Sequence, residues 1–345
     1  MNSCSLKREI QIDNIKLFAC IFVVLGHFFQ SMVKADIMPE SVSYLWFNKT
    51  IGLFHVQLFF ICSGYLYQKT TKGINFKSHA NNIVKKAIAL LIPYFTFSIL
   101  TWVLKNIFSS SVNDQTAGII NSLFLRPLSP YWYLYCLFLL FVITPIIKNK
   151  KGAEILISIG LIFKIISGLI SINIYALSCI FSNLIWFATG MALQYFDINS
   201  LAKKFKLIGG LLCIALFGIL NAVYFKHNIK FPCYDFIMSI FACLGFMLLF
   251  CYIFERNKQP RVLEFLSKYT MPIFLLHTIF AATLRAILIK VGITNAAMHI
   301  ALGILISFAG PIIVAMIGEK IKFIDFFFYP VKYVKKQAKK LRPTK

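Results

Sequence analysis

Long apolar runs recur along the whole sequence, and they limit what this chain can fold into. Runs of about twenty residues match the ~30 Å hydrocarbon core that a transmembrane helix has to cross. Hydrophobic residues make up 59% of the 345 positions and charged residues only 14%. A membrane β-barrel would instead show short segments of alternating polarity. The sequence therefore predicts an all-α polytopic membrane protein with about ten transmembrane helices.

The apolar runs also set the expected domain organisation. We expect residues 1–345 to form a single transmembrane domain, with a basic cytosolic tail at 332–345. A cleavable signal peptide is not expected, because the first run is long and carries Asp13 and Lys16. In the connection 109–130, residues 117–125 are apolar enough to dip into the membrane interface. The expected spans are 12–32, 47–67, 87–107, 131–147, 153–172, 175–195, 207–225, 236–254, 270–290 and 299–318.

The positive charges lie mainly in alternate connections between the spans. The net charge is +24, and 26 of the 36 Lys and Arg residues fall on one side of the membrane if the N-terminus is cytosolic. This bias predicts that both termini lie inside. The same distribution argues for contact with anionic lipid and against nucleic-acid binding. The preference for Lys over Arg, 30 to 6, hints at a bacterial protein, for which the plasma membrane is the expected location.

Metal binding is not expected. The nine cysteines are scattered, mostly within apolar runs, and no Cys-x-x-Cys pair occurs. Histidine and acidic residues do not recur at the spacings of metal ligands.

The first span carries two ionisable residues on one face. Lys16 and His27 are eleven positions apart, which on a helix is three turns plus about 20°, or roughly 16 Å along the axis. An ionisable group inside a span usually faces the protein interior or a water-filled cavity. The pair therefore predicts a site that begins in cytosolic water and ends within the bilayer. We expect the buried imidazole to be neutral at pH 7 and able to accept a proton from an alcohol.

Further polar residues in the spans are candidates for substrate binding. Each could be a hydrogen-bonded packing residue, and this explanation is preferred for His299; His27, His55 and His277 together favour a site. Ser63 lies beside Cys62 and Gly64, so helix packing is its alternative role. For Arg285 the alternative is snorkelling to the interface, and for Trp132 an aromatic belt. The candidates are His55, Ser63, Trp132, His277 and Arg285.

Lysines follow the second span. Lys69, Lys72 and Lys85 fit a cytosolic collar for a phosphate-bearing ligand, and Lys16 points the same way. The alternative explanation is the positive-inside bias alone. A glycine-rich phosphate loop is absent from the sequence, which argues against nucleotide hydrolysis.

Several short motifs, taken in order, resemble the integral-membrane acyltransferase family three. The opening Ile12-Asp13-Asn14-Ile15-Lys16-Leu17-Phe18-Ala19 is followed by Val24-Leu25-Gly26-His27. Then come Phe54-His55-Val56-Gln57-Leu58-Phe59-Phe60-Ile61-Cys62-Ser63-Gly64-Tyr65-Leu66, Leu91-Ile92-Pro93-Tyr94, Tyr131-Trp132-Tyr133-Leu134 and Met271-Pro272-Ile273-Phe274-Leu275-Leu276-His277. Lys16 stands where the family usually has Arg, and Gln57 where it usually has Pro.

The resemblance implies an enzyme. Members of this family are thought to take an acyl group, often from cytosolic acetyl-CoA, and pass it to a hydroxyl of a cell-surface or lipid-linked glycan. It implies that His27 and Lys16 act as a catalytic pair and that acyl-CoA is the donor, bound near Lys16, Lys69, Lys72 and Lys85. The acyl group could be acetyl or succinyl. A covalent acyl-His27 step remains an alternative to general-base catalysis.

Two other classes stay open. Polar residues within spans also mark transport pathways, so an exporter of glycan or lipid-linked sugar is the alternative function. Paired broken helices or an inverted repeat, which would support a transporter, are not evident in the sequence. A sensory or scaffold membrane domain is the third possibility.

Overall fold

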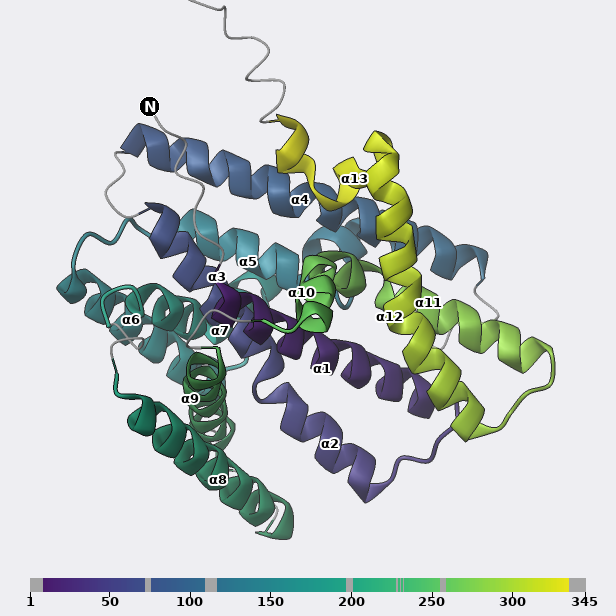
Figure 1. Ribbon diagram of the computed structural model, residues 1–345, viewed down its shortest axis with the longest axis horizontal. Coiled ribbons are helices and arrows are strands. Elements are labelled where there is room, and N and C mark those ends of the chain that lie inside the picture. Colours follow the sequence, from purple (N-terminus) through teal and green to yellow (C-terminus); the bar gives the residue numbers. More distant parts are fainter. Residues whose placement is uncertain are drawn as a thin grey trace, which may run out of the picture.

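The computed structural model describes residues 9–71, 76–108, 117–196, 201–227, 229, 231, 233–254 and 259–334. Within these ranges the regular structure is helical, without strands (Figure 1). Nine stretches of these residues are long and apolar enough to cross a membrane, and the helix Trp132–Ile143 is a shorter apolar one. The all-α polytopic fold is thereby confirmed, whereas the sidedness of the termini stays a prediction.

The helices follow the expected spans closely in most of the chain. In order they are α1 (Ile10–Lys34), α2 (Val42–Gly52), α3 (His55–Thr71), α4 (Phe76–Ile107), the π-helix η2 (Asn121–Leu125), α5 (Trp132–Ile143), α6 (Lys150–Leu169), α7 (Tyr175–Ala192), α8 (Lys203–His227), α9 (Tyr234–Ile253), α10 (Arg261–Lys268), α11 (Thr270–Lys290), α12 (Ala296–Lys320) and α13 (Lys322–Phe328).

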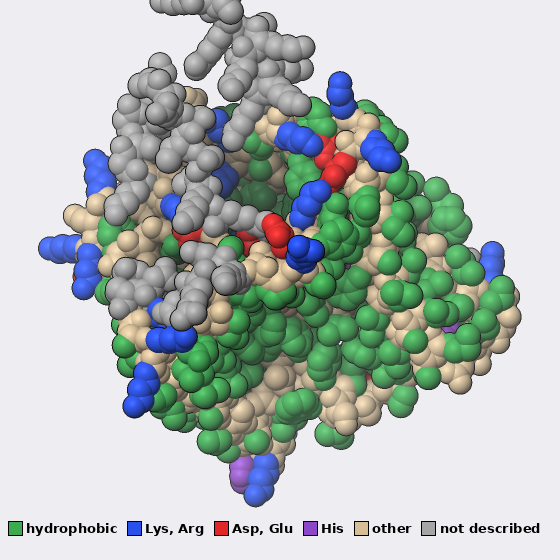
Figure 2. All heavy atoms as spheres, in the orientation of Figure 1, with side chains coloured by type: hydrophobic (Ala, Val, Ile, Leu, Met, Phe, Trp, Pro, Cys, Tyr) green, Lys and Arg blue, Asp and Glu red, His purple; other side chains and the backbone are tan. Residues whose placement is uncertain are grey.

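Many large apolar side chains are exposed on the molecular surface. In Figure 2 hydrophobic side chains dominate the visible face, and Lys and Arg side chains gather at its rim. Ile107 and Leu169 are each 67% exposed, and many other large apolar side chains are also exposed. Such an extended apolar surface fits a lipid environment and would be a liability in water.

The expected span 47–67 is wrong in one respect, because it is not one continuous helix. The chain turns at Leu53 and Phe54, whose amides bond back to Thr50 and Ile51 at 3.3 and 3.2 Å. Each of these hydrogen bonds spans three residues instead of the four of an α-helix, so α2 ends here. Helix α3 then begins at His55. The turn at the end of α2 sets the direction in which the first residues of α3 point.

The expected span 131–147 is also corrected, since α5 has only 12 residues. Twelve helical residues extend about 18 Å, which is less than the hydrocarbon core. The helix stops at Thr144, and Pro145 follows, whose ring disfavours helical geometry in the preceding residue.

The segment before α5 packs along α4 and supplies part of the length that the short α5 lacks. Trp102 Nε1 donates to the Ala117 carbonyl at 2.9 Å, and Tyr94 Oη donates to the Leu123 carbonyl at 2.5 Å. These two partners are eight residues apart on α4, so the segment runs along α4 for about 12 Å. Non-helical backbone is tolerated at this depth where it packs against protein. We call residues 117–131, which contain η2, the re-entrant segment, because they run along α4 from Trp102 to Tyr94 and return to Thr101 at Tyr131. That residues 117–125 dip into the membrane interface stays a prediction.

Helices α3 and α7 approach each other backbone to backbone. A Cβ atom on Gly64 would lie 2.0 Å from the Phe187 carbonyl oxygen, and one on Gly190 would lie 2.0 Å from the Ile61 carbonyl oxygen. Small residues allow this kind of contact between membrane helices. The packing role considered for the residues around Ser63 therefore applies to Gly64.

Adding a methyl group at this contact should destabilise the fold. We expect Gly190→Ala to lower the free energy of unfolding by about 1–3 kcal/mol, because the α3 backbone has to move away. Gly218→Ala on α8 is the matched control, since nothing lies within 4 Å of its Cβ position. Thermal unfolding of the purified protein in detergent measures both. Equal midpoints for the two variants would contradict the close contact.

Candidate functional site

A cavity of about 390 Å³ joins residues of α1, α4 and α11 with the segment that precedes α5. We call it the histidine cavity because His27 and His277 both line it. The lining of α1 runs from Val24 to Lys34, so the cavity reaches His27 from the C-terminal end of that helix. Its polar lining residues are His27, Gln30, Ser31, Lys34, Thr101, Lys105, Ser129, His277, Thr278, Thr283, Arg285 and Lys290.

The two histidines of the cavity face each other across α1 and α11. Their ring centroids are 5.5 Å apart, with an angle of 33° between the ring planes. His27 is partly exposed, whereas His277 is 1% exposed. The sequence predicted both as functional candidates, and the structure brings them together in one cavity.

Hydrogen bonds fix the tautomer of His277. Its Nδ1 lies 3.0 Å from both the Ile273 and the Phe274 carbonyl oxygens. A carbonyl oxygen only accepts, so Nδ1 carries the proton and Nε2 of the neutral ring is an acceptor. His277 Nε2 is buried and has no hydrogen-bond partner within the described parts of the chain. A substrate hydroxyl could donate to this nitrogen.

The re-entrant segment delivers a third polar group to the histidines. Ser129 Oγ lies 3.4 Å from His27 Nε2. Its neighbour Tyr131 is fully buried, and the phenol oxygen contacts the Leu275 carbonyl at 2.9 Å and Thr101 Oγ1 at 2.8 Å. These contacts bind the segment to α11 and α4, which fixes Ser129 beside α1.

Arg285 lies in the same cavity, two turns along α11 from His277. Its side chain is 8% exposed, and Nη1 donates to the Ser31 carbonyl of α1 at 3.1 Å. Snorkelling to the interface does not describe this geometry, because the guanidinium turns inward to a neighbouring helix. Lys34, Lys105 and Lys290 add further positive charge to the lining. This end of the cavity therefore favours a substrate with electronegative oxygen atoms.

Lys16 does not line the histidine cavity. It lies about two turns before Val24, where the cavity lining of α1 begins. On the face that leads from Lys16 to His27, α1 carries Ala19, Cys20 and Val23, which are 0–3% exposed. The helical period placed Lys16 and His27 on one face, and buried side chains fill the distance between them.

Three other candidates lie outside the cavity lining. His55 Nδ1 donates to the Ile51 carbonyl at 2.5 Å, and the ring is an electrostatic neighbour of His27. Ser63 Oγ is bonded to Tyr133 Oη at 3.0 Å between α3 and α5. Trp132 is partly buried and packs against the hydrophobic core. These three side chains contact other parts of the protein instead of lining the cavity. They therefore contribute to helix packing and not to ligand binding.

Of the predicted phosphate-binding lysines, Lys69 lies near the N-terminal end of α1. Lys69 forms an ion pair with Glu9, which also accepts a hydrogen bond from Tyr65 at 2.9 Å. Lys85 is exposed on α4, which extends beyond its expected start at residue 87. Lys72 lies outside the described residues.

Sequence reasoning missed several lining residues of the cavity. Ser129, Thr101 and Thr278 are ordinary polar residues in or beside apolar segments, and no pattern distinguishes them from packing residues. Gln30, which forms a side-chain hydrogen bond with His27, is one turn further along α1. Its spacing from His27 is the one signal that could have indicated it.

The fold and the cavity define an integral membrane protein with an ionisable site between its helices. A sequence profile described as an acyltransferase domain matches residues 9–316, about nine-tenths of the chain. The chain belongs to this family, acyltransferase family three, and the resemblance noted in the sequence is confirmed.

Curated relatives match over part of their length. Nodulation protein NolL of Mesorhizobium japonicum is 24% identical over 151 residues, which are 43% of this chain and 38% of the relative. Nodulation protein NolL of Sinorhizobium fredii is 30% identical over 149 residues, covering 41% of this chain and 38% of the relative. The aligned region is thus less than two-fifths of each relative. The comparison with solved structures gives no match.

The geometry predicts a structural role for Ser63. We expect Ser63→Ala to lower the free energy of unfolding by about 0.5–1.5 kcal/mol, because the hydrogen bond to Tyr133 is lost. Ser158→Ala is the control, since Ser158 is exposed on α6 and bonds only its own helix. Thermal unfolding and acyl incorporation are measured side by side. An unchanged midpoint with lost incorporation would instead assign Ser63 to substrate binding.

Proposed function

We propose that this protein is a membrane-bound O-acyltransferase that moves an acyl group from acyl-CoA to a hydroxyl of a cell-surface or lipid-linked glycan. The observation that carries the proposal is the pair His27 and His277 in one cavity, in a chain of the acyltransferase family. The donor is most simply acetyl-CoA. The expected location is the bacterial plasma membrane.

In the proposed reaction the acceptor occupies the histidine cavity. His277 Nε2 accepts a hydrogen bond from a neighbouring hydroxyl of the acceptor that does not react, since this nitrogen is buried with an unused lone pair. His27 takes the proton of the reacting hydroxyl as its oxygen attacks the thioester carbonyl carbon. The carbon–sulfur bond breaks, the new ester stays on the acceptor, and the CoA thiolate recovers the proton from His27.

Other groups act on parts of the substrates that do not react. Arg285 lies about 12 Å along α11 from His277, and its Nη1 is bonded to the Ser31 carbonyl, about one turn beyond His27 on α1. We assign it to an oxygen of the acceptor that does not react. We assign the donor to the Lys16 end of α1, with its phosphates near Lys69, Lys72 and Lys85. Because Ala19, Cys20 and Val23 are buried there, the thioester has to separate packed helices in order to reach His27.

Removal of the proposed base should abolish acyl transfer. We expect His27→Ala to reduce acyl incorporation by about 10²–10⁴-fold, the usual contribution of a general base. The host is a strain lacking the gene, complemented with each variant. Mass spectrometry of its surface glycans measures ester-linked acyl groups, and immunoblotting of membranes measures insertion.

His227→Ala is the matched control for this experiment. His227 is exposed at the end of α8 and contributes nothing to the cavity lining. Full incorporation by an inserted His27→Ala variant would overturn the proposed role of His27.

Purified protein in liposomes separates acyl transfer from transport. The enzyme should release free CoA from acetyl-CoA only when an acceptor glycan extract is present. Translocation of that glycan without acyl-CoA would instead support an exporter.

A further inference from the structure

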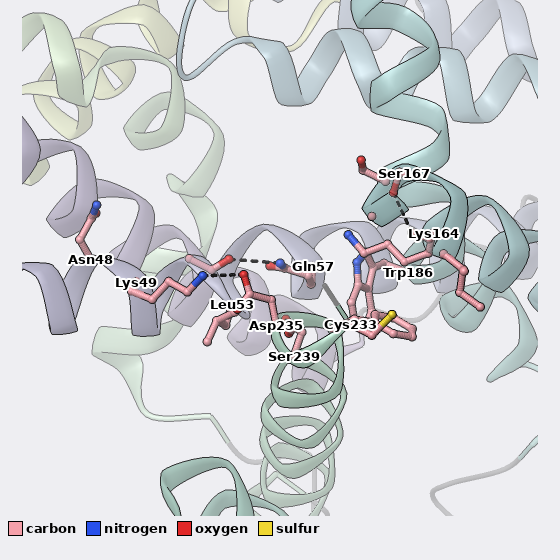
Figure 3. Close-up of a pocket in the computed structure, with 15 residues that line it drawn as sticks. Asn48, Lys49, Leu53, Gln57, Lys164, Ser167, Trp186, Cys233, Asp235 and Ser239 are labelled. Atoms are coloured by element: carbon pink, nitrogen blue, oxygen red, sulfur yellow. Dashed lines mark hydrogen bonds and ion pairs between the residues drawn. The ribbon is translucent and has the colours of Figure 1, made fainter. Parts of the chain in front are cut away.

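A second cavity, of about 480 Å³, lies between α2, α3, α6, α7 and α9 (Figure 3). We call it the polar pocket, and the residues that carry the argument are Lys49, Gln57, Lys164, Trp186, Asp235 and Ser239. It shares no lining residue with the histidine cavity. Neither the candidate site nor the proposed reaction uses it.

The polar pocket concentrates charge within membrane-crossing segments. Lys49 on α2 forms an ion pair with Asp235 on α9 at 2.5 Å. Lys164 reaches from α6 toward Gln57 in Figure 3, and Asp235 is one of its electrostatic neighbours. Charged side chains in apolar segments are costly unless they face water, an opposite charge or a ligand. Two ammonium groups facing one carboxylate leave an excess of hydrogen-bond donors in the pocket.

Gln57 supplies the complementary group, an acceptor that has no donor. Its Nε2 donates to the Gly52 carbonyl at 3.1 Å, which orients the amide. The other amide atom, Oε1, is buried and lacks a hydrogen-bond partner among the described residues. An amide oxygen can only accept, so the group that satisfies it has to carry an O–H or N–H. An anion without a hydrogen atom, such as chloride or sulfate, could pair with Lys164 but could not satisfy Gln57.

We infer that the polar pocket binds a sugar residue. Each sugar hydroxyl both donates and accepts, so one ring can donate to Gln57 Oε1 and accept from Lys164. The carboxylate of Asp235 and the hydroxyl of Ser239 also line the pocket and offer further partners. Trp186 lines the pocket as an apolar surface for the C–H face of the ring. The volume falls within the usual range of small-ligand sites.

The pocket gives the sugar a place in the proposed reaction. His55 and Gln57 are two residues apart in the first turn of α3, which directs them about 200° apart. His55 thus lies toward His27 while Gln57 lines the polar pocket. The bound sugar is then a unit of the acceptor glycan that is not acylated. This role rests on the proposed function, whereas sugar binding itself does not.

Saturation-transfer difference NMR tests sugar binding without any acyl transfer. The full-length protein is placed in phosphatidylcholine nanodiscs and titrated with methyl glycosides of glucose, galactose, mannose and N-acetylglucosamine. At least one glycoside should receive saturation from the protein. Gln57→Leu and Lys164→Met should each weaken binding about tenfold, the effect of losing one good hydrogen bond.

Matched variants separate this inference from the proposed function. Lys150→Met on the same helix as Lys164 is the control, because Lys150 is exposed and pairs with Glu154. His27→Ala should also retain glycoside binding while it loses acyl incorporation. Glycoside binding in a protein that proves to have no acyltransferase activity would leave the pocket assignment intact and overturn only the proposed function.

Three results would overturn the sugar site. One is no saturation transfer to any glycoside, and another is equal binding by the wild type, Gln57→Leu and Lys164→Met. The third is loss of glycoside binding in nanodiscs of phosphatidylglycerol, which would assign the pocket to the glycerol headgroup of a lipid. Variants are compared only when their thermal midpoints match, and Lys164→Gln replaces Lys164→Met where they do not.

Discussion

A polar group within the apolar part of a membrane has to find its partner inside the protein, and the structure around the candidate site depends on this constraint. The re-entrant segment departs from α-helical geometry, so some of its carbonyls need donors from neighbouring helices. Tyr94 supplies one to Leu123, and Trp102 supplies one to Ala117. With the segment held in this way, Ser129 reaches His27 and contributes to the lining of the cavity beside α1, α4 and α11.

The length of the apolar runs predicted most of the fold but could not reveal where the chain turns within a run. The spans that became α1, α8, α11 and α12 are continuous, and a run of twenty apolar residues is enough to identify them. The turn at Leu53 and Phe54 falls within an equally apolar run, so hydropathy does not mark it. In contrast, the early end of α5 has a local cause that is visible in the sequence, because Pro145 disfavours helical geometry in the preceding residue.

The candidate site was predictable residue by residue but not as an arrangement. An ionisable side chain within a span is energetically costly and therefore rare. This rarity identified His27 and His277 separately as candidates. They are 250 positions apart in the sequence, and only the packing of α1 against α11 brings their rings to 5.5 Å. Lys16 is the opposite case, a residue expected to share a site with His27 that does not. The helical period places both on one face of α1, but buried side chains separate them. Periodicity defines a face and does not define what packs against it.

The first turn of α3 links the two cavities through one backbone feature. A continuous helix through residues 47–67 would give His55 and Gln57 no special position, because each would be one residue among many on a long span. The break after Gly52 instead makes both of them first-turn residues whose side chains bond back to α2: His55 to Ile51 and Gln57 to Gly52. Each side chain is oriented by that bond, one toward His27 and the other into the polar pocket. A change in the angle between α2 and α3 would therefore move both side chains at once.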